Sequence, residues 1–348
     1  MYTIDSTSIT VSGFSAGGFM AAQLAIAYSS NFSAFGIFAG GPYDCARNQD
    51  FFTVCMYNAT PSIELPTSNI KEWSAEGRIE SIDNLLSKKV YVQSGVLDEV
   101  IGLSVTRELV TQLENFVSRE NIRHVELEGA AHVFPTNSDI LNITTSAVAK
   151  DIQPQCNSST HPFIANCGYD GAGEMLQWLY NDNLTIPPSK PKTSELQGTL
   201  HKYPQTHSLG AMGLAEHGYY YLPSTCRPNS TSLQPRKCKL HLALHGCTMS
   251  HNDIGEIFLR SSGYLDWAEA NDMVVMFPQA ERDETLRPIW NGTEFAGGAL
   301  ACFDWIGWVG DDADWKSGKQ MRAIMNAVEW IAKQSEGEEG EWRRDDEL

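Results

Sequence analysis

The feature that most constrains this chain is the run from Gly13 to Gly17, which reads glycine, phenylalanine, serine, alanine, glycine. A strand-like stretch at residues 9–12 precedes it, and residues 16–28 follow with the composition of a helix. A G-x-S-x-G motif between strand and helix is typical of a nucleophile elbow. Such a turn exposes the serine oxygen, here Ser15 Oγ, above a sheet and at a helix N-terminus that favours negative charge. The motif predicts a nucleophilic serine on an α/β fold.

Strand-like and helix-like segments alternate along the rest of the chain. We predict strands at residues 9–12, 34–39, 90–93, 125–127, 219–222, 240–244 and 273–277, and helices at residues 16–28, 100–117, 176–179 and 321–331. Strands separated by helices indicate a mostly parallel sheet. We predict a single catalytic domain over residues 1–334, with an irregular stretch at 133–170, a proline-rich linker or loop at 182–197, and an acidic, disordered tail at 335–348.

A serine hydroxyl is a weak nucleophile unless a base takes its proton and an acid orients that base. Above a nucleophile elbow the three residues follow in the order serine, acid, histidine, each on a loop after a strand. Asp98 lies just past the predicted strand at residues 90–93, with Glu99 as the alternative acid, and His132 follows the strand at 125–127. Ser15, Asp98 and His132 are therefore the predicted catalytic triad.

The backbone donors that stabilise an oxyanion come from a displaced part of the sequence. Lipases and esterases carry an H-G motif after an early strand, upstream of the serine. No such motif precedes Ser15, but His245-Gly246-Cys247 follows the predicted strand at 240–244 and lies after the predicted histidine base. A parallel sheet tolerates a moved chain start where the original ends lie close together. We therefore predict a circular permutation, with an oxyanion hole formed by the N–H groups of Ala16 and Cys247.

Charge and composition narrow the classes of partner. The 348-residue chain carries 25 Lys and Arg against 43 Asp and Glu, a formal net charge of −18. Nucleic acids and anionic membranes bind basic faces, so we expect neither as a partner. No run of about 18 apolar residues occurs, so we expect no membrane span. The cysteines form no C-x-x-C pair, and we expect no metal, no organic cofactor and a monomer.

Cysteines and glycosylation motifs indicate an oxidising compartment. Several of the eight cysteines lie about ten residues apart, a spacing that suits local disulfide loops, although the sequence alone does not choose among 105 pairings. Seven N-x-S/T motifs are glycosylation candidates: Asn31, Asn58, Asn142, Asn157, Asn183, Asn229 and Asn291. Met1 is followed by neither the basic nor the apolar region of a signal peptide, so we expect that an N-terminal segment is missing.

Five longer sequence motifs are more specific than the G-x-S-x-G motif. They are SGFSAGGFMAAQL at 12–24, FAGGPYDCA at 38–46, GAAHVFPT at 129–136, LALHGC at 242–247 and IWNG at 289–292. Together they resemble the fungal, single-domain, secreted poly(3-hydroxybutyrate) depolymerases, over residues from about 8 to about 333. This resemblance implies a circularly permuted α/β-hydrolase, in agreement with the motif order.

The resemblance also implies particular residue roles. It implies Ser15, Asp98 and His132 as the triad, the Cys247 N–H as an oxyanion donor and Trp290 as a wall of the substrate crevice. We place His245, beside that donor, among the substrate-binding residues as well. The resemblance supports the disulfide pairs Cys45–Cys55, Cys156–Cys167, Cys226–Cys238 and Cys247–Cys302.

The expected activity is hydrolysis of ester bonds in poly(3-hydroxybutyrate) or related short-chain polyesters through an acyl-enzyme. A carboxylesterase acting on soluble or plant cell-wall esters would use the same triad, and a non-catalytic binding protein of this fold is the alternative from another class. We expect secretion. The C-terminal residues 345–348, Asp-Asp-Glu-Leu, resemble an endoplasmic-reticulum retrieval signal and offer a luminal location as the alternative.

Overall fold

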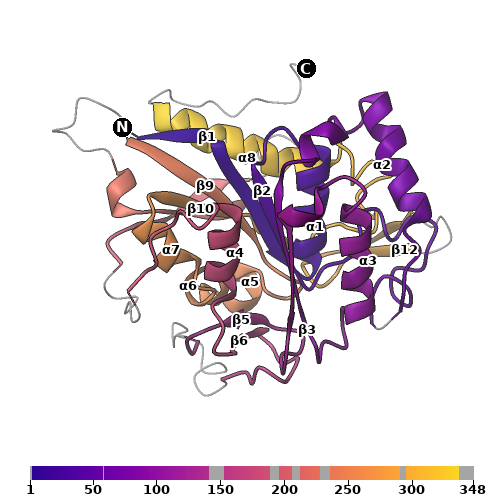
Figure 1. The fold of residues 1–348 in the computed structure, drawn as a ribbon, viewed down its shortest axis with the longest axis horizontal. Helices are drawn as coiled ribbons and strands as arrows, with labels where there is room; N and C mark the ends of the chain where they lie inside the picture. The colour runs from indigo at the N-terminus through magenta and orange to yellow at the C-terminus, as the bar shows by residue number, and fades with distance from the viewer. Residues whose placement is uncertain are drawn as a thin grey trace.

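The computed structural model describes residues 2–57, 59–140, 153–188, 196–205, 212–227, 236–290 and 295–336. At its centre is an eight-stranded sheet with the order β4-β3-β2-β1-β9-β10-β8-β7 (Figure 1). Its strands are β1 (Tyr2–Phe14), β2 (Ala34–Phe38), β3 (Lys89–Gly95), β4 (Ile122–Leu127), β7 (Thr199–Pro204), β8 (His217–Leu222), β9 (Arg236–Leu244) and β10 (Met273–Phe277). Neighbours from β4 to β10 are parallel, and β8 is antiparallel to β10 and β7. The predicted mostly parallel sheet is confirmed.

The remaining elements surround this sheet. The helices are α1 (Ala16–Ala27), α2 (Glu64–Glu76), α3 (Leu103–Leu113), α4 (Gly171–Leu179), α5 (His251–Ile254), α6 (Ile257–Ser261), α7 (Tyr264–Ala270) and α8 (Lys319–Glu336), with 3₁₀ turns at Ile82–Leu85, Arg119–Asn121 and Ser224–Cys226. Two small sheets pair β5 (Phe134–Thr136) with β6 (Ile164–Asn166) and β11 (Asp283–Pro288) with β12 (Phe295–Gly298). None of the described helices combines the length and apolar character needed to cross a membrane.

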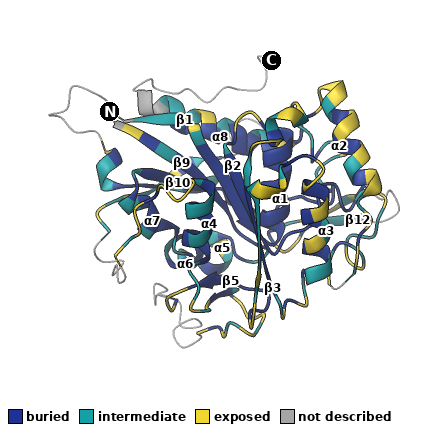
Figure 2. Cartoon of the chain, in the orientation of Figure 1, coloured by how far each residue is buried: buried dark blue, intermediate teal, exposed yellow. Residues whose placement is uncertain are grey.

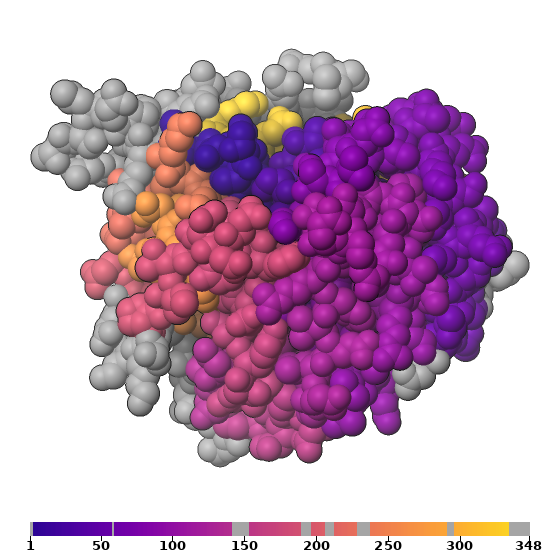
Figure 3. Space-filling model, in the orientation of Figure 1, coloured from indigo at the N-terminus to yellow at the C-terminus, as the bar shows by residue number. Residues whose placement is uncertain are grey.

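The strand order confirms the predicted circular permutation. Strand β9, from the last third of the chain, pairs in parallel with β1, with Ile9 opposite Leu240 and Gly13 opposite Leu244. When β7–β10 are counted before β1–β4, the sheet reads 1-2-4-3-5-6-7-8, the order of the α/β-hydrolase fold. In the space-filling view, the indigo start of β1 lies beside the orange β9 (Figure 3). Segments from the two ends of the sequence therefore form the middle of the sheet.

The permuted halves are joined through the predicted linker region. After α4, the described residues 180–188 pass along the body, where the Asn271 side chain bonds the backbone N–H and C=O of Thr185 at 2.6 and 2.9 Å. The chain then enters the sheet as β7, at the edge opposite β4. The last described helix, α8, lies along β1 (Figure 1). Helix α8, which closes the half that contains β7–β10, therefore lies near β1, which opens the half that contains β1–β4. A permutation requires this proximity.

Two apolar clusters pack on the two faces of the sheet. Leu240, Leu242 and Leu244 of β9 enter the cluster that holds most of α1 and α8, whereas Ala243 enters the cluster with α4, α6 and α7. All residues of α1 are buried, and this helix is dark blue in Figure 2. Alanine and glycine make α1 narrow enough to lie in the interior, with the nucleophile elbow at its N-terminus.

Several elements differ from the sequence prediction. Helix α2 was not predicted, because few of its residues are apolar and only Pro66, Asn69, Ile70 and Trp73 are buried. Strands β5 and β6 lie inside the stretch predicted to be irregular, and each is only three residues long. The predicted disordered tail at 335–348 begins too early, because residues 335 and 336 belong to helix α8; residues 337–348 lie outside the described residues.

A buried polar network crosses the strands below the nucleophile. His241 of β9 is fully buried, and its ring nitrogens lie 2.7 Å from Thr10 Oγ1 and 2.8 Å from Ser12 Oγ of β1. Ser12 Oγ also lies 2.7 Å from the Tyr264 hydroxyl of α7. Burial lowers the pKa of His241 from 6.5 to about 3, so this histidine is neutral in the folded protein at neutral pH.

We expect this network to make the protein sensitive to acid. Between pH 6.5 and about 3, the unfolded chain binds a proton at His241 that the folded protein does not bind, so the free energy of unfolding falls as pH falls. Urea unfolding across this range should show a slope shallower by up to about 1.4 kcal/mol per pH unit in His241→Gln than in the wild type. The partly exposed His217→Gln is the matched control and should keep the wild-type slope. Equal slopes for all three proteins would contradict the assignment.

Candidate active site

The nucleophile elbow forms where β1 meets α1. Ser15 has a φ of 56°, a left-handed value that is strained for a residue with a side chain. Its N–H donates to the Phe38 carbonyl at 2.9 Å. A Cβ on Gly13 would overlap the Gly17 carbonyl, and a Cβ on Gly17 would overlap the His245 carbonyl. Both glycines of the motif are therefore required by the close approach of backbone segments.

The structure brings the three predicted triad residues together. His132 Nε2 lies 3.0 Å from Ser15 Oγ, and His132 Nδ1 lies 2.8 Å from Asp98 Oδ2. All three residues are buried. An ionised carboxylate only accepts hydrogen bonds, so Nδ1–H donates to Asp98 and Nε2 is left to accept the Ser15 hydroxyl proton. This is the arrangement of a serine nucleophile with an oriented general base.

Local hydrogen bonds direct Asp98, and not Glu99, towards His132. Asp98 Oδ1 accepts the N–H groups of Val100 and Ile101 at 2.8 Å each, so its second oxygen faces His132. Glu99, the alternative, is exposed. The His132 backbone N–H donates to Ser159 Oγ at 3.1 Å, and the Phe14 ring packs 4.8 Å from the imidazole. Strand ends therefore place the acid and the base, and local hydrogen bonds fix their orientation.

The two residues predicted to supply the oxyanion donors, Ala16 and Cys247, line one pocket with the nucleophile. The Ala16 N–H belongs to the first turn of α1, where N–H groups lack helical partners. Cys247 lines the same pocket as Ser15 and Ala16. Within the described part of the chain, the Cys247 N–H donates to no protein acceptor. A Cβ on Gly246 would lie 3.2 Å from Ser15 Cβ, so this peptide passes directly beside the nucleophile.

A disulfide anchors this loop to the pocket wall. Cys247 is bonded to Cys302, with 4.3 Å between the Cα atoms, and the adjacent Thr248 N–H donates to the Leu300 carbonyl at 2.6 Å. The other three predicted pairs, Cys45–Cys55, Cys156–Cys167 and Cys226–Cys238, are also present. Among the glycosylation candidates, the described Asn31, Asn157 and Asn183 are exposed, whereas Asn58, Asn142, Asn229 and Asn291 lie outside the described residues.

An apolar pocket of about 350 Å³ opens beside Ser15. Its wall is largely aromatic, with Trp305 stacked on Phe19 at 4.1 Å between ring centroids. Other side chains in the lining are Phe51, Phe52, Met56, Ile101, Leu300, Ile306 and Trp308. A neutral, apolar acyl group would be buried here next to the nucleophile.

A single buried carboxylate holds the tryptophan wall in place. Asp304 Oδ1 accepts the N–H groups of residues 306, 307 and 308 at 3.1, 2.8 and 3.2 Å, and Oδ2 accepts that of Val309 at 2.8 Å. The Asp304 backbone is bonded in turn by Gln320 and Gln23 at 2.8 and 3.1 Å. Burial raises the pKa of Asp304 to about 6, although the four N–H groups act to lower it. These contacts fix the loop that carries Trp305 and Trp308.

The two residues predicted to bind substrate do not lie in this lining. Trp290 is buried outside this lining. Its backbone N–H donates to the Ile306 carbonyl at 3.1 Å, its ring contacts Gly307, and the Arg47 guanidinium lies 4.5 Å from the ring centroid. His245 is fully buried, with both ring nitrogens bonded to backbone groups. Trp305 and Trp308 line the pocket beside Ser15 instead. The density of tryptophans between residues 303 and 315 was the sequence signal for them.

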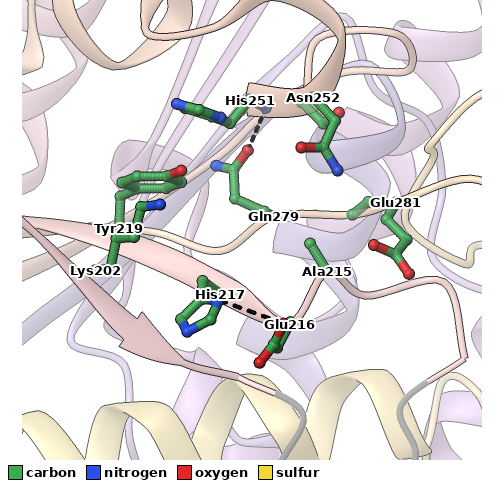
Figure 4. Close-up of a pocket in the computed structure, with 11 residues that line it drawn as sticks. Lys202, Ala215, Glu216, His217, Tyr219, His251, Asn252, Gln279 and Glu281 are labelled. Atoms are coloured by element: carbon green, nitrogen blue, oxygen red, sulfur yellow. Dashed lines mark hydrogen bonds and ion pairs between the residues drawn. The ribbon is translucent and has the colours of Figure 1, made fainter.

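A second, polar pocket of about 290 Å³ is lined by residues of β7, β8, the start of α5 and the segment after β10 (Figure 4). Gln279 lies at its base and accepts the His251 backbone N–H through Oε1 at 2.7 Å. The His251 ring stacks on Tyr219 at 4.6 Å, and Lys202 and Glu281 lie at the sides. None of the triad residues lines this pocket. The described residues hold no cluster of three or more His, Cys, Asp or Glu side chains suited to a metal ion.

The fold and the site together define a serine hydrolase of the α/β-hydrolase type. No protein-family model matches the chain. It is 41% identical over 337 residues to a polyhydroxybutyrate depolymerase from Talaromyces funiculosus, with 97% of this chain and 93% of that protein covered. It is 32% identical over 339 residues to a poly(3-hydroxybutyrate) depolymerase from Delftia acidovorans, with 94% of this chain and 60% of that protein covered.

Solved structures agree with these relatives. The crystal structure of PHB depolymerase from Penicillium funiculosum matches with a TM-score of 0.86 at 42% identity, covering 95% of this chain and 98% of that one. A serine-to-alanine variant of PHB depolymerase complexed with R3HB trimer matches with a TM-score of 0.86 at 41% identity, with the same coverage. The chain belongs to the polyhydroxybutyrate depolymerase family. The resemblance to poly(3-hydroxybutyrate) depolymerases that the longer sequence motifs indicated is thereby confirmed.

The Cys247–Cys302 disulfide should contribute both to stability and to turnover, because it anchors a residue that lines the pocket with Ser15. Replacing both cysteines by serine should lower the free energy of unfolding by about 2–5 kcal/mol and should also lower kcat, because the Cys247 N–H loses its anchor. The matched control, Cys226→Ser with Cys238→Ser, removes a bond at the opposite end of β9. It should lose stability while keeping kcat. Urea unfolding and turnover of a p-nitrophenyl ester measure the two effects, and an unchanged kcat in the folded Cys247/Cys302 double variant would refute the anchoring role.

Proposed function

We propose that this protein hydrolyses the ester bonds of poly(3-hydroxybutyrate) or of related short-chain polyesters. The observation that carries the proposal is the hydrogen-bond chain from Ser15 through His132 to Asp98, beside an aromatic pocket. The family relationship supports the substrate class, since the relatives carry that activity in their names and one was solved with an R3HB trimer. A non-catalytic binding protein would have no need of three aligned triad residues.

The reaction proceeds through an acyl-enzyme. His132 Nε2 takes the hydroxyl proton as Ser15 Oγ attacks the ester carbonyl, and Asp98 holds the imidazole tautomer. The N–H groups of Ala16 and Cys247 stabilise the tetrahedral oxyanion. His132 then gives its proton to the leaving alcohol oxygen, and the carbon–oxygen bond breaks. A water molecule repeats the sequence on the acyl group, which releases the acid and restores Ser15.

The pocket fits an acyl chain without charge. Its lining is apolar, and Trp305 and Trp308 supply flat surfaces next to Ser15, so we assign to them the substrate contact first expected of Trp290. A charged acyl group would be desolvated there without a partner. Soluble short-chain esters fit the same pocket, so a carboxylesterase of that kind is the close alternative.

Exposed apolar side chains around the pocket supply contact with a solid substrate. Phe52 and Leu300 line the pocket and are 50% and 53% exposed, and the Phe52 ring lies 5.1 Å from that of Tyr57, itself 41% exposed. Apolar side chains in water near a site are favoured partners for a neutral polymer surface. We propose that this rim adsorbs to the polyester while a chain segment enters the pocket.

The compartment and assembly follow from the same features. The four disulfides support an oxidising, extracellular location. The luminal alternative depends on residues 345–348, which lie outside the described residues. We propose a monomer, because the triad, both oxyanion donors and the pocket all come from one chain.

Removal of a triad residue tests the proposal directly. Ser15→Ala, His132→Ala and Asp98→Asn should each lower turnover of a poly(3-hydroxybutyrate) suspension and of p-nitrophenyl butyrate on the order of 10⁴-fold, with the fold intact by circular dichroism. Glu99→Gln, next to the acid but exposed, is the matched control and should keep its rate. A folded Ser15→Ala protein that retains near-normal rates would exclude the mechanism.

Replacement of a rim residue separates polymer from soluble substrate. Phe52→Ser should slow clearing of a polymer film several-fold, because adsorption weakens, and should lower turnover of p-nitrophenyl butyrate much less, because the rest of the pocket lining remains. Leu86→Ser replaces a side chain of similar exposure, 61%, near the amino end of β3 and so at the opposite edge of the sheet from the triad. That control should leave both rates unchanged. Parallel losses on film and soluble ester in Phe52→Ser would count against an adsorbing rim.

A further inference from the structure

His245 directly precedes residues 246–248, which we call the oxyanion loop. Its ring makes two hydrogen bonds to backbone groups. Its Nδ1 lies 2.7 Å from the Gly246 carbonyl oxygen, and its Nε2 lies 3.0 Å from the Ala280 nitrogen. A carbonyl oxygen only accepts and a backbone N–H only donates. The imidazole is therefore protonated on Nδ1 and unprotonated on Nε2. Burial lowers the pKa of His245 to about 4, so the ring is neutral at neutral pH.

The bond to Gly246 bears on the oxyanion hole through the geometry of the peptide. The Gly246 carbonyl and the Cys247 N–H belong to one planar trans unit and point in opposite directions. A bond that fixes the direction of the carbonyl therefore also fixes the direction of the N–H. The carbonyl faces His245 inside the protein, and the N–H lies on the other side of the peptide, where Cys247 lines the pocket with Ser15.

We propose that His245 is a positioning residue. By donating a hydrogen bond to the Gly246 carbonyl, it holds the Cys247 N–H in the direction that binds the oxyanion. This inference rests on the proposed ester hydrolysis, and it replaces the substrate contact first expected of His245. The histidine touches neither substrate nor nucleophile. It acts by preventing rotation of one peptide plane.

Other contacts of the loop restrain the direction of the Gly246–Cys247 peptide less directly. The Cys247–Cys302 disulfide fixes a side chain, and the Met249 N–H reaches the Gly246 carbonyl only at 3.3 Å, within the same turn. His245 is tied to a different element through Ala280, which follows β10. The neighbouring Gln279 is itself held by the α5 backbone at the polar pocket of Figure 4. The ring therefore transmits the position of the β10 end to the oxyanion loop.

Two neutral replacements separate the two bonds of the ring. In His245→Asn the side-chain NH₂ occupies the place of Nδ1 and can still donate to the Gly246 carbonyl. In His245→Gln the amide oxygen reaches the place of Nε2 and can accept from Ala280, but the donor to Gly246 is lost. We expect His245→Asn to keep kcat within about tenfold of wild type and His245→Gln to lose about 10²- to 10³-fold, with similar KM, on p-nitrophenyl butyrate.

A transition-state analogue gives a readout that a merely structural role would not move. A butyl boronic acid forms a tetrahedral adduct on Ser15 with an oxygen in the oxyanion hole, so its Ki should rise in parallel with the loss of kcat. Thermal unfolding should show that both variants are folded at the assay temperature. Equal activity of the two variants, or a greater loss in His245→Asn, would overturn the proposal. A wild-type protein with no activity on polymer or soluble ester would instead remove the proposed function itself.

A measurement on the wild type keeps the proposal testable if neither variant folds. Neutron diffraction from crystals exchanged into heavy water at neutral pH should show the deuteron on His245 Nδ1, directed at the Gly246 oxygen, with none on Nε2. A deuteron on Nε2 with a bare Nδ1 would remove the donor on which the proposal depends.

Discussion

The close contact between the nucleophile elbow and the end of β9 is the constraint on which the rest of the site depends. Gly17 of α1 lies against the carbonyl of His245, and Gly246 lies against Ser15, with no room for a side chain at either position. This contact places Ser15 at the end of β1, the proposed donor Ala16 at the start of α1 and the proposed donor Cys247 just after β9. Because β1 and β9 pair in parallel with Gly13 opposite Leu244, this one pairing fixes how close both Ala16 and Cys247 lie to Ser15.

The convergence of the three proposed triad residues could be predicted because order and position along the chain carry the information. Ser15, Asp98 and His132 each follow a predicted strand, and parallel strands bring their carboxyl ends to one edge of the sheet. The permutation could also be predicted from the sequence. The motif His245-Gly246 follows His132, whereas in an unpermuted chain it precedes the nucleophilic serine. These features depend on local motifs and on topology, which sequence patterns report well.

The substrate wall could not be predicted in the same way. Trp290 and Trp305 are both tryptophans in irregular segments, and no periodicity tells which of them faces solvent or a pocket. The difference arises from contacts between distant residues: Arg47 stacks over Trp290, whereas the Asp304 carboxylate turns the following residues so that Trp305 and Trp308 face Ser15. The environment of His245 was unpredictable for a related reason, since only the fold reveals that both of its nitrogens are bonded inside the protein.

The permuted strand order also determines when the enzyme can become active during its own synthesis. Ser15 and its helix leave the ribosome early, whereas β9 and Cys247 follow only after the triad residues are complete. Until β9 arrives, one edge of β1 has no partner, and such an edge is an opportunity for wrong pairing. A nascent chain therefore carries the three proposed triad residues before the proposed donor Cys247, and we expect hydrolytic competence to appear late, when the last third of the polypeptide closes the middle of the sheet.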